Sequence, residues 1–356
     1  MKFYYSANIF IVVVAMAIMS VSVKYNLSID KKQKRAMVML FLSIIAAALC
    51  EWGGVMLDGV STDYIIWHTI IKTLELSISP FIAVLCSYSI ADHDHKKIAI
   101  YVMLANVVLE IISAFTGFIF YVDSSNYYHH GTCYWIYSVF LALGILLFLY
   151  SGITATRKYQ YTGGIIIFLI LIFIVAGLTV QLFFSSIKID WIVMAVASIM
   201  LYKFYGDMLS QSDGLTGLLN RLGYENYILK LNGKGAIIIF DVDDFKDIND
   251  TFGHANGDYY LREVSDIIRK IYKPYGMTFR IGGDEFCVVV RKDVGKMEEC
   301  GRKLQEIIMQ RIEQDANFPN ISFGYADFDT SKEDIAEAFA KADAAMYNCK
   351  SSRKAK

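Results

Sequence analysis

Hydrophobic and polar positions divide this 356-residue chain into two parts of different character. Residues 1–205 consist of long apolar runs broken by short polar loops, whereas residues 206–356 alternate short apolar strands with amphipathic helical patterns. Of the 69 Asp, Glu, Lys and Arg residues, 46 lie in residues 206–356. The length and apolarity of the first part are typical of a membrane domain, because about 20 apolar residues in a helix cross the bilayer core.

Seven apolar segments of the first part are predicted to be transmembrane helices. A buried core of soluble helices is the alternative, and the lengths of the segments argue against it. The fold class predicted for residues 1–205 is therefore an all-α membrane bundle. The expected spans are Phe3 to Val23, Ala36 to Leu57, Tyr64 to Ile90, Ile98 to Tyr121, Trp135 to Ile153, Gly164 to Phe184 and Trp191 to Tyr205.

Basic residues in the loops predict the orientation of this bundle, because Lys and Arg near the ends of spans favour the cytoplasm. Such residues occur at 24–35, 96–97 and 157–158, whereas loops 58–63 and 122–134 contain none. We therefore expect a multi-pass protein of the cell membrane with its amino terminus outside the cell. Seven spans then bring residues 206–356 into the cytoplasm.

Ionisable side chains within the expected spans are candidates for a sensor site, since charge inside a bilayer is costly. His68, Lys72 and Glu75 share one helical face, and Glu51 and Glu110 lie in neighbouring spans. These five residues are the sensor candidates. Glu51, His68 and Lys72 fall in the outer half of the bilayer in this topology, so we expect an outward-facing pocket for a small polar ligand from outside the cell. The alternative is a neutralised Lys72–Glu75 or Lys72–Glu51 pair that only holds helices together.

In the second part, the turn Gly282-Gly283-Asp284-Glu285-Phe286 lies between two segments rich in β-formers. Two glycines leave the main chain open to a bulky polyphosphate. The two acids present oxygen ligands of the kind that Mg²⁺ prefers. An ordinary hairpin with a solvated acid pair is the alternative interpretation.

Upstream of this turn, the apolar run Gly235 to Phe240 predicts a buried strand that ends in the acidic cluster Asp241 to Asp244. Ligands of open α/β sheets usually bind at the carboxyl ends of strands. The polar residues Asn249 and Asp258 follow, and their amide and carboxylate groups match the donors and acceptors on the edge of guanine. Capping of helices is the alternative role for these two residues.

These features resemble the GGDEF family of diguanylate cyclases over about Ser212 to Lys350. The resemblance implies an α/β fold, an α+β palm-like domain of nucleotide-cyclase type, for residues 213–356. Residues 206–212 are then a short linker after the sensor domain at 1–205. Four motifs match in order: Asp213-Gly214-Leu215-Thr216-Gly217-Leu218-Leu219-Asn220-Arg221, Asp241 to Asp258, Arg280 to Phe286, and Ala342-Asp343-Ala344-Ala345-Met346-Tyr347-Asn348-Cys349-Lys350.

Helical patterns and β-rich segments in the second part agree with this fold. Helices are expected at Gly223 to Leu231, Tyr259 to Tyr272, Met297 to Gln314 and Lys332 to Cys349, and strands near Ala236, Thr278, Phe286 and Ile321.

The chemistry that the resemblance implies is condensation of two GTP molecules into cyclic di-GMP with loss of pyrophosphate. Two Mg²⁺ ions per site, with Mn²⁺ as the alternative ion, would assist it. The implied metal ligands are Asp241, the Val242 carbonyl and Asp284. Glu285 is the acid assigned to deprotonation of the 3′-hydroxyl, and Asp284 and Lys246 complete the catalytic set.

The implied substrate-binding residues divide between base and phosphate. Asn249 and Asp258 are expected to contact guanine, whereas Lys246, Lys350 and Arg280 are expected on the phosphate side. A carboxylate at position 258 favours guanine over adenine, because it would face an acceptor on the adenine ring.

Two GTP molecules react across two sites, so this activity requires a homodimer. A catalytically inactive domain that binds GTP or another protein is the alternative function. The net charge of −1 argues against nucleic acid as a partner. The six cysteines have no metal-ligand spacing.

Many members of the family carry an Arg-x-x-Asp pair before the glycines that binds product and restrains activity. The aligned residues here are Lys273-Pro274-Tyr275-Gly276, which lack both the arginine and the aspartate. We therefore predict no product inhibition through this site.

Overall fold

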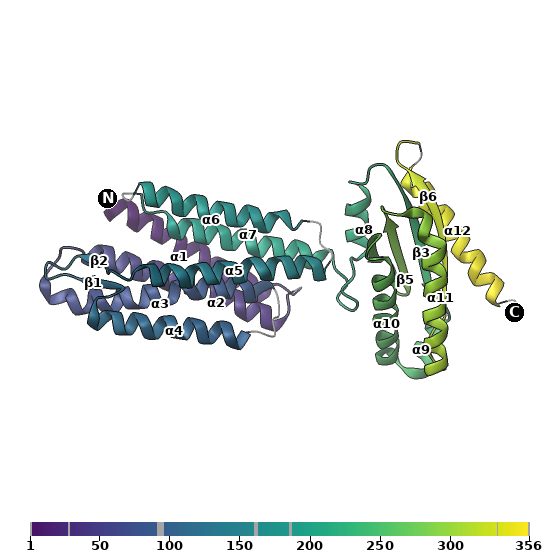
Figure 1. Ribbon diagram of the computed structural model, residues 1–356, viewed down its shortest axis with the longest axis horizontal. Helices are drawn as coiled ribbons and strands as arrows, with labels where there is room; N and C mark the ends of the chain where they lie inside the picture. The colour runs from purple at the N-terminus through teal and green to yellow at the C-terminus, as the bar shows by residue number, and fades with distance from the viewer. Residues whose placement is uncertain are drawn as a thin grey trace. The chain divides into compact units, whose positions relative to one another are not determined.

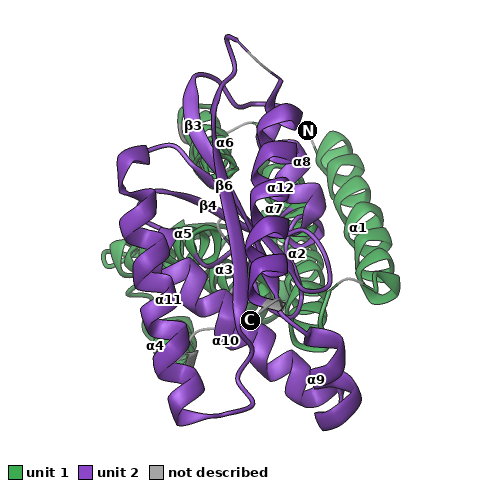
Figure 2. Cartoon of the chain, turned by 90° about the vertical axis from the view of Figure 1, so that its right-hand side faces the viewer, with its two compact units in different colours: residues 1–157, 162–207 green, residues 158–161, 208–356 purple. Residues whose placement is uncertain are grey.

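The computed structural model describes residues 2–27, 29–90, 96–159, 163–184, 187–332 and 334–354 (Figure 1). The chain forms two compact units, shown in separate colours in Figure 2. The first unit comprises residues 1–157 and 162–207, and the second comprises 158–161 and 208–356.

The first unit is a bundle of long helices (Figure 1). Among the described residues, six helices are long and apolar enough to cross a membrane. The sixth expected span, 164–184, corresponds to α6, in which the apolar stretch among the described residues, Ile165–Val180, is shorter than the other six helices. Seven spans are therefore not confirmed. The helices are α1 Lys2–Tyr25, α2 Lys31–Leu57, α3 Ile65–Ile90 after the short 3-10 helix Thr62–Tyr64, α4 Lys96–Thr116, α5 Trp135–Lys158, α6 Ile165–Phe183 and α7 Asp190–Ser210.

A β-hairpin follows α4 and corrects the expected fourth span, which was too long. The helix ends at Thr116, and strands β1 (Phe120–Val122) and β2 (Tyr128–His130) pair antiparallel. The Ser113 hydroxyl accepts bonds from the backbone N–H groups of residues 119 and 120, at 2.9 and 3.0 Å, where the helix gives way to the strand. At the tip, Asn126 donates to the backbone carbonyls of residues 57 and 61, which ties the hairpin to the α2–α3 loop.

A proline inside α3 is compensated by a side chain of α4. Pro80 has no N–H group, so it cannot bond to the Leu76 carbonyl one turn earlier. The amide of Asn106 donates to that carbonyl at 3.2 Å. Because both groups are buried, this bond joins α3 and α4 within the bundle.

The second unit is a four-stranded sheet with helices on both faces, so the predicted α/β class is confirmed (Figure 1). The sheet order is β4-β5-β3-β6, and every neighbouring pair is antiparallel. Its strands are β3 Lys234–Val242, β4 Gly276–Arg280, β5 Glu285–Val290 and β6 Ile321–Asp329. Its helices are α8 Arg221–Ile228, α9 Phe245–Phe252, α10 His254–Tyr272, α11 Met297–Gln314 and α12 Ile335–Lys354, with the 3-10 turn Val294–Lys296 before α11.

Alternation along the central strand β3 separates two hydrophobic cores. Phe240 belongs to the core that α10 and α11 cover, whereas its neighbour Ile239 belongs to the core that α8 and α12 cover. Both faces of the strand are therefore buried, as its continuous apolar run predicts. The four expected strands are present, and α9 is a helix that was not among those predicted.

Candidate active site

The acidic turn lies beside the carboxyl end of the central strand. Strand β5 begins at Glu285, which is paired in register with Asp241 of β3. The Val242 N–H donates to the Asp284 carbonyl at 3.1 Å, and the Ile281 N–H donates to the Glu285 carbonyl at 2.9 Å. The first of these bonds brings the two parts of the expected metal site together, although more than 40 residues separate them in the chain, and the second closes the turn.

Arg280 links the turn to Asp213 through hydrogen bonds of its guanidinium. Its Nη2 donates to the Gly283 carbonyl at 2.6 Å, and its Nη1 donates to Asp213 Oδ1 at 3.0 Å. The guanidinium expected to bind substrate is therefore engaged within the protein. Burial alone would raise the pKa of Asp213, but bonds from Thr216 and Arg280 outweigh it and hold this pKa below its usual value. Asp213 consequently stays ionised as a partner for Arg280.

The two acids of the turn differ in environment. Partial burial raises the pKa of the Glu285 carboxyl above its ordinary value, and the carboxylates of Asp284 and Asp241 raise it further. Like charges close together disfavour ionisation, which is why these neighbours act on the pKa of Glu285 in the same direction as burial. A carboxyl with a raised pKa is suited to accept a proton.

Two basic residues of α12 reach the end of β3. The Lys350 ammonium contacts the Asp241 carboxylate. Arg353 donates to the Ile321 carbonyl at 2.6 Å and lies 3.4 Å from Asp243 Oδ2. Asp243 also accepts from Ser322 at 2.8 Å. The sequence had singled out Lys350 only through the family resemblance, and Arg353 and Asp243 had no assigned role because their partners lie far away in the chain.

The donor set at this end of the sheet fits a hard cation. Asp241, Asp284 and the Val242 carbonyl supply only oxygen atoms, and Asp241 already has a cationic partner in Lys350. Among the described residues no three His, Cys, Asp or Glu side chains form a ready-made metal cluster. Mg²⁺ sites commonly use one or two carboxylates and complete their coordination with substrate phosphates. The residues present therefore fit Mg²⁺ together with a nucleotide.

The residues expected to contact guanine, Asn249 and Asp258, lie on α9 and α10, and the phosphate-side residue Lys246 is also on α9. Lys246 and Asp258 are exposed, and Asn249 is half-buried. The two helices meet at Gly253, whose φ of 81° is a conformation that favours glycine. Gly257 faces Asn249 closely, because a Cβ at residue 257 would lie 2.0 Å from Asn249 Oδ1. The amide of Asn249 thus occupies space that only a glycine leaves open.

Glu285 also lines a cavity of about 410 Å³. Its lining includes Arg221, Tyr224, Phe339 and Asp343. The Asp343 carboxylate raises the pKa of Glu285, whereas Arg221 lowers it. Arg221 and Asp343 belong to sequence motifs that carried the resemblance, but no role was expected for them. Their proximity to the acid is a result of tertiary packing.

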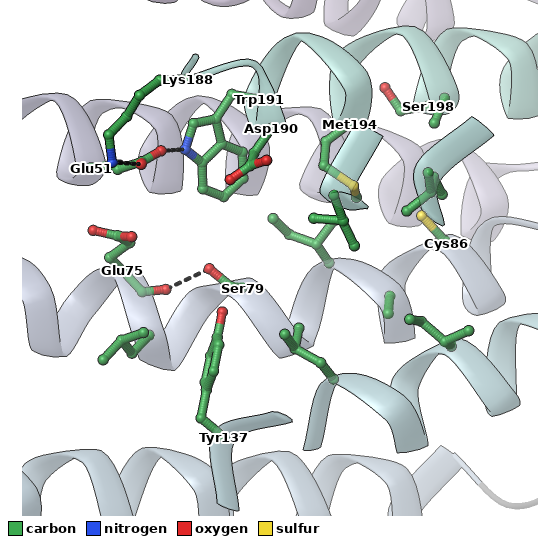
Figure 3. A pocket seen from close by; sticks show the side chains of 18 of the residues that line it. Glu51, Glu75, Ser79, Cys86, Tyr137, Lys188, Asp190, Trp191, Met194 and Ser198 are labelled. Atoms are coloured by element: carbon green, nitrogen blue, oxygen red, sulfur yellow. Dashed lines mark hydrogen bonds and ion pairs between the residues drawn. The ribbon is translucent and has the colours of Figure 1, made fainter. Parts of the chain in front are cut away.

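The expected sensor residues occupy two environments in the first unit. Lys72 and Glu75 form an ion pair of 2.8 Å, which is one of the structural pairs that the sequence allowed. Glu51 contacts Lys188 of the α6–α7 loop at 3.4 Å and the indole of Trp191 (Figure 3).

His68 and Glu110 lie apart from these two ion pairs. The imidazole of His68 bonds Asn126 at 3.0 Å. Glu110 is fully buried, and neither carboxyl oxygen has a hydrogen-bond partner among the described residues. A cavity lined by Glu51, Lys72 and Glu75 is present, and its described lining does not include His68 or Glu110.

Comparison with known proteins identifies the second unit. A family model described as "Diguanylate cyclase, GGDEF domain" matches residues 210–356. Residues 210–356 form a GGDEF domain. The chain is 35% identical over 161 residues to diguanylate cyclase DgcS of Shewanella oneidensis, covering 42% of this chain and 53% of DgcS. It is 34% identical over 149 residues to diguanylate cyclase DgcP of Escherichia coli, covering 39% of this chain and 44% of DgcP.

The GGDEF domain also matches solved structures. The GGDEF domain of DgcB from Caulobacter crescentus, in complex with c-di-GMP, is 25% identical. The match covers 40% of this chain and 91% of that structure, with a TM-score of 0.36. The chain spans about half the length of the curated relatives described above. The GGDEF domain is thus homologous to diguanylate cyclases, and the resemblance stated from the motifs is confirmed.

Proposed function

We propose that this protein is a membrane-bound diguanylate cyclase that condenses two GTP molecules into cyclic di-GMP and pyrophosphate. The observation that carries the proposal is the pairing of Asp241 with Glu285 across β3 and β5, with Asp284 at the adjoining turn. Three carboxylates at one end of the sheet suit the binding of cations, and cations neutralise charge during phosphoryl transfer. The domain that holds them is homologous to diguanylate cyclases.

In this proposal Asp241, Asp284 and the Val242 carbonyl hold two Mg²⁺ ions, with Mn²⁺ as the alternative. Bound ions would supply charge neutralisation at the triphosphate and the 3′-hydroxyl. Glu285 accepts the proton of the 3′-hydroxyl, consistent with its raised pKa. Lys350, which contacts Asp241 in this structure, would together with Lys246 contact phosphate oxygens of the bound nucleotide.

Guanine is read by Asn249 and Asp258 in the same proposal. The amide of Asn249 offers both a donor and an acceptor, and the carboxylate of Asp258 accepts from the two N–H groups of the guanine edge. The close approach of Gly257 supports this role, because it sets where the Asn249 amide can lie.

Replacing Gly257 with alanine is expected to raise the KM for GTP about tenfold with a small effect on the free energy of unfolding. The new Cβ displaces the Asn249 amide, and one lost hydrogen bond to the base costs about 1 kcal/mol or slightly more. Steady-state kinetics of the purified protein measures the change. Gly295→Ala is the matched control, because a Cβ there meets no atom within 4 Å. An unchanged KM in Gly257→Ala would remove Asn249 from the base site.

For the first unit, we propose a membrane sensor with an outside amino terminus and a cytoplasmic GGDEF domain. The distribution of basic loops supports this orientation, and it requires that α6 crosses the membrane together with the six longer apolar helices. Helix α7 continues to Ser210, three residues before Asp213, so a change in the bundle has a short route along the chain to the catalytic motifs.

Incubation of the full-length protein in detergent with GTP and Mg²⁺ tests the proposed activity. We expect cyclic di-GMP and pyrophosphate as products, and loss of both when EDTA removes the divalent ion. Chromatographic separation of the nucleotides provides the measurement. GTP that binds and remains unchanged would instead support the alternative of a GTP-binding module without turnover.

Product inhibition through the site before the glycines is expected to be absent. Lys273 and Gly276 replace the arginine and aspartate of the family's product-binding pair. A side chain at residue 276 would also clash, because its Cβ would lie 2.1 Å from the Val289 carbonyl. Initial rates of the GGDEF domain dimerised by a fused coiled coil should therefore stay constant as cyclic di-GMP is added. Tight binding of product with suppression of turnover would contradict this prediction.

A further inference from the structure

A cavity of about 310 Å³ lies within the helical bundle of the first unit (Figure 3). Protein interiors are close-packed, and voids much larger than a water molecule are few. The volume of this cavity falls at the lower end of the range for small-molecule sites. Side chains from α2, α3, α5, α6 and α7 and from the β1–β2 hairpin line it. Its size and its multiple walls distinguish it from a packing defect.

One end of the cavity is charged and aromatic. The ammonium of Lys72 lies 2.8 Å from Glu75 and 4.7 Å from the ring centroid of Tyr128. Glu51 contacts Lys188 and the indole of Trp191 (Figure 3). The described residues of the lining include two lysines, Lys72 and Lys188, and four acids, Glu51, Asp58, Glu75 and Asp190. With all six ionised, Lys72 and Lys188 balance Glu75 and Glu51, and Asp58 and Asp190 give the lining an excess of two negative charges.

The other end of the cavity is apolar. Phe148, Ile170 and Leu201 line it, and they are buried within the bundle. Figure 3 shows the charged groups of Glu51 and Lys188 on one side of the view and Cys86 on the opposite side. A ligand that satisfies both ends must itself be amphipathic, because an all-polar molecule would leave its polar groups unpaired against the apolar wall.

We propose that this cavity binds a small organic cation, with its ammonium group at the Glu51 and Glu75 end and its apolar part against Phe148 and Ile170. The excess of carboxylates attracts a cation and repels an anionic head group. The faces of aromatic rings at the same end offer a further surface for an ammonium group. A free alkylamine and the amine head group of a lipid share this chemistry. Binding is independent of the proposed cyclase activity, whereas any effect of the ligand on turnover rests on it.

Thermal unfolding of the full-length protein in dodecyl maltoside tests binding without any turnover. Hexylammonium is the probe, and hexanol and hexanoate are controls of equal chain length with neutral and negative head groups. We expect rising hexylammonium to increase the Tm, because a ligand that binds only the folded state stabilises it. Equal shifts with all three compounds, or no shift with hexylammonium, would overturn the proposal.

Two variants of the cavity sharpen the test. Glu75→Gln should weaken hexylammonium binding about tenfold, the loss expected for one charge-assisted hydrogen bond. Ala197→Leu should weaken hexylammonium binding by reducing the volume at a buried position of the lining. Glu110→Gln is the matched control. It also removes a buried carboxyl of the bundle, but Glu110 is not among the described residues that line the cavity. If Glu75→Gln and Glu110→Gln bind the probe equally and as tightly as the parent, the cation site is disproved.

Added lipids distinguish the two sources of the amine. If phosphatidylethanolamine raises the Tm more than phosphatidylglycerol does and abolishes the hexylammonium shift, the ligand is a lipid amine. If neither lipid affects that shift, the ligand is a free amine; both outcomes support the cation site. Cyclic di-GMP production measured with saturating hexylammonium then tests the sensor separately. Constant turnover despite binding would refute control of the cyclase and leave the binding site intact.

Discussion

Replacing Asp284 with alanine is expected to reduce cyclic di-GMP formation at least about a hundredfold. Metal neutralisation of phosphoryl charge contributes several kcal/mol to the transition state, and each 1.4 kcal/mol is about a tenfold change in rate. Asp284 is partly exposed at the turn beside Val242, so the fold should tolerate the loss of its side chain. Quantification of product from GTP and Mg²⁺ by the purified full-length protein measures the effect.

Asp327→Asn is the matched control for this substitution. It removes an exposed carboxylate from β6, in the same domain but outside the proposed metal site, and turnover should remain at the parent level. Thermal unfolding of both variants separates a loss of chemistry from a loss of folding. If Asp284→Ala makes product at the parent rate, Asp284 is not a metal ligand and the cyclase proposal loses its main support.

The second large effect is expected from dimerisation. A fragment from Gly206 onward, fused to a parallel coiled coil, should turn over GTP about a hundredfold faster than the unfused fragment at low micromolar concentration. Two GTP molecules must react across two half-sites, and tethering raises the effective concentration of the second domain toward the millimolar range. The fragment contains nearly all of the second compact unit with its own two hydrophobic cores, so it is a suitable object for this test.

The concentration dependence of the unfused fragment gives an independent measurement. Its specific activity should rise with protein concentration, whereas that of the fused fragment should stay constant. A fusion whose coiled-coil core positions are changed to charged residues controls for the added segment, because it keeps the length and loses the pairing. Equal specific activity of the monomeric and fused fragments at every concentration would show that one domain suffices.

The path from the membrane bundle to the catalytic motifs is short in this chain. Helix α7 begins at Asp190 and Trp191, where the indole contacts Glu51, and it ends at Ser210. Within the second unit, the Asn220 amide donates to the Ser210 carbonyl at 2.8 Å. Under the proposed sensor function, one helix therefore joins the charged end of the cavity to the start of the GGDEF domain.

Local sequence patterns were sufficient to predict those elements whose pattern lies within one contiguous segment. The apolar runs predicted the helices of the bundle, and the β-rich flanks of the glycine pair predicted the hairpin of β4 and β5. The fourth span was predicted too long because Tyr121 and its neighbours are apolar, and hydrophobicity alone does not distinguish a helix end from a buried strand. The helix α9 was missed because its side chains are mostly polar, and none of its residues is fully buried.

The sequence by itself determined the two-part organisation of this protein, the order of its four motifs and the presence of a GGDEF domain, since these are properties of contiguous residues. Only the tertiary structure decided that Glu285 lies opposite Asp241, that Arg280 is engaged by Asp213, and that Lys350 and Arg353 reach the end of β3. It also decided that Glu51 pairs with Lys188 at a cavity in the bundle. These contacts join residues that are tens to more than a hundred positions apart, and strand register and helix packing, which no local pattern encodes, bring them together.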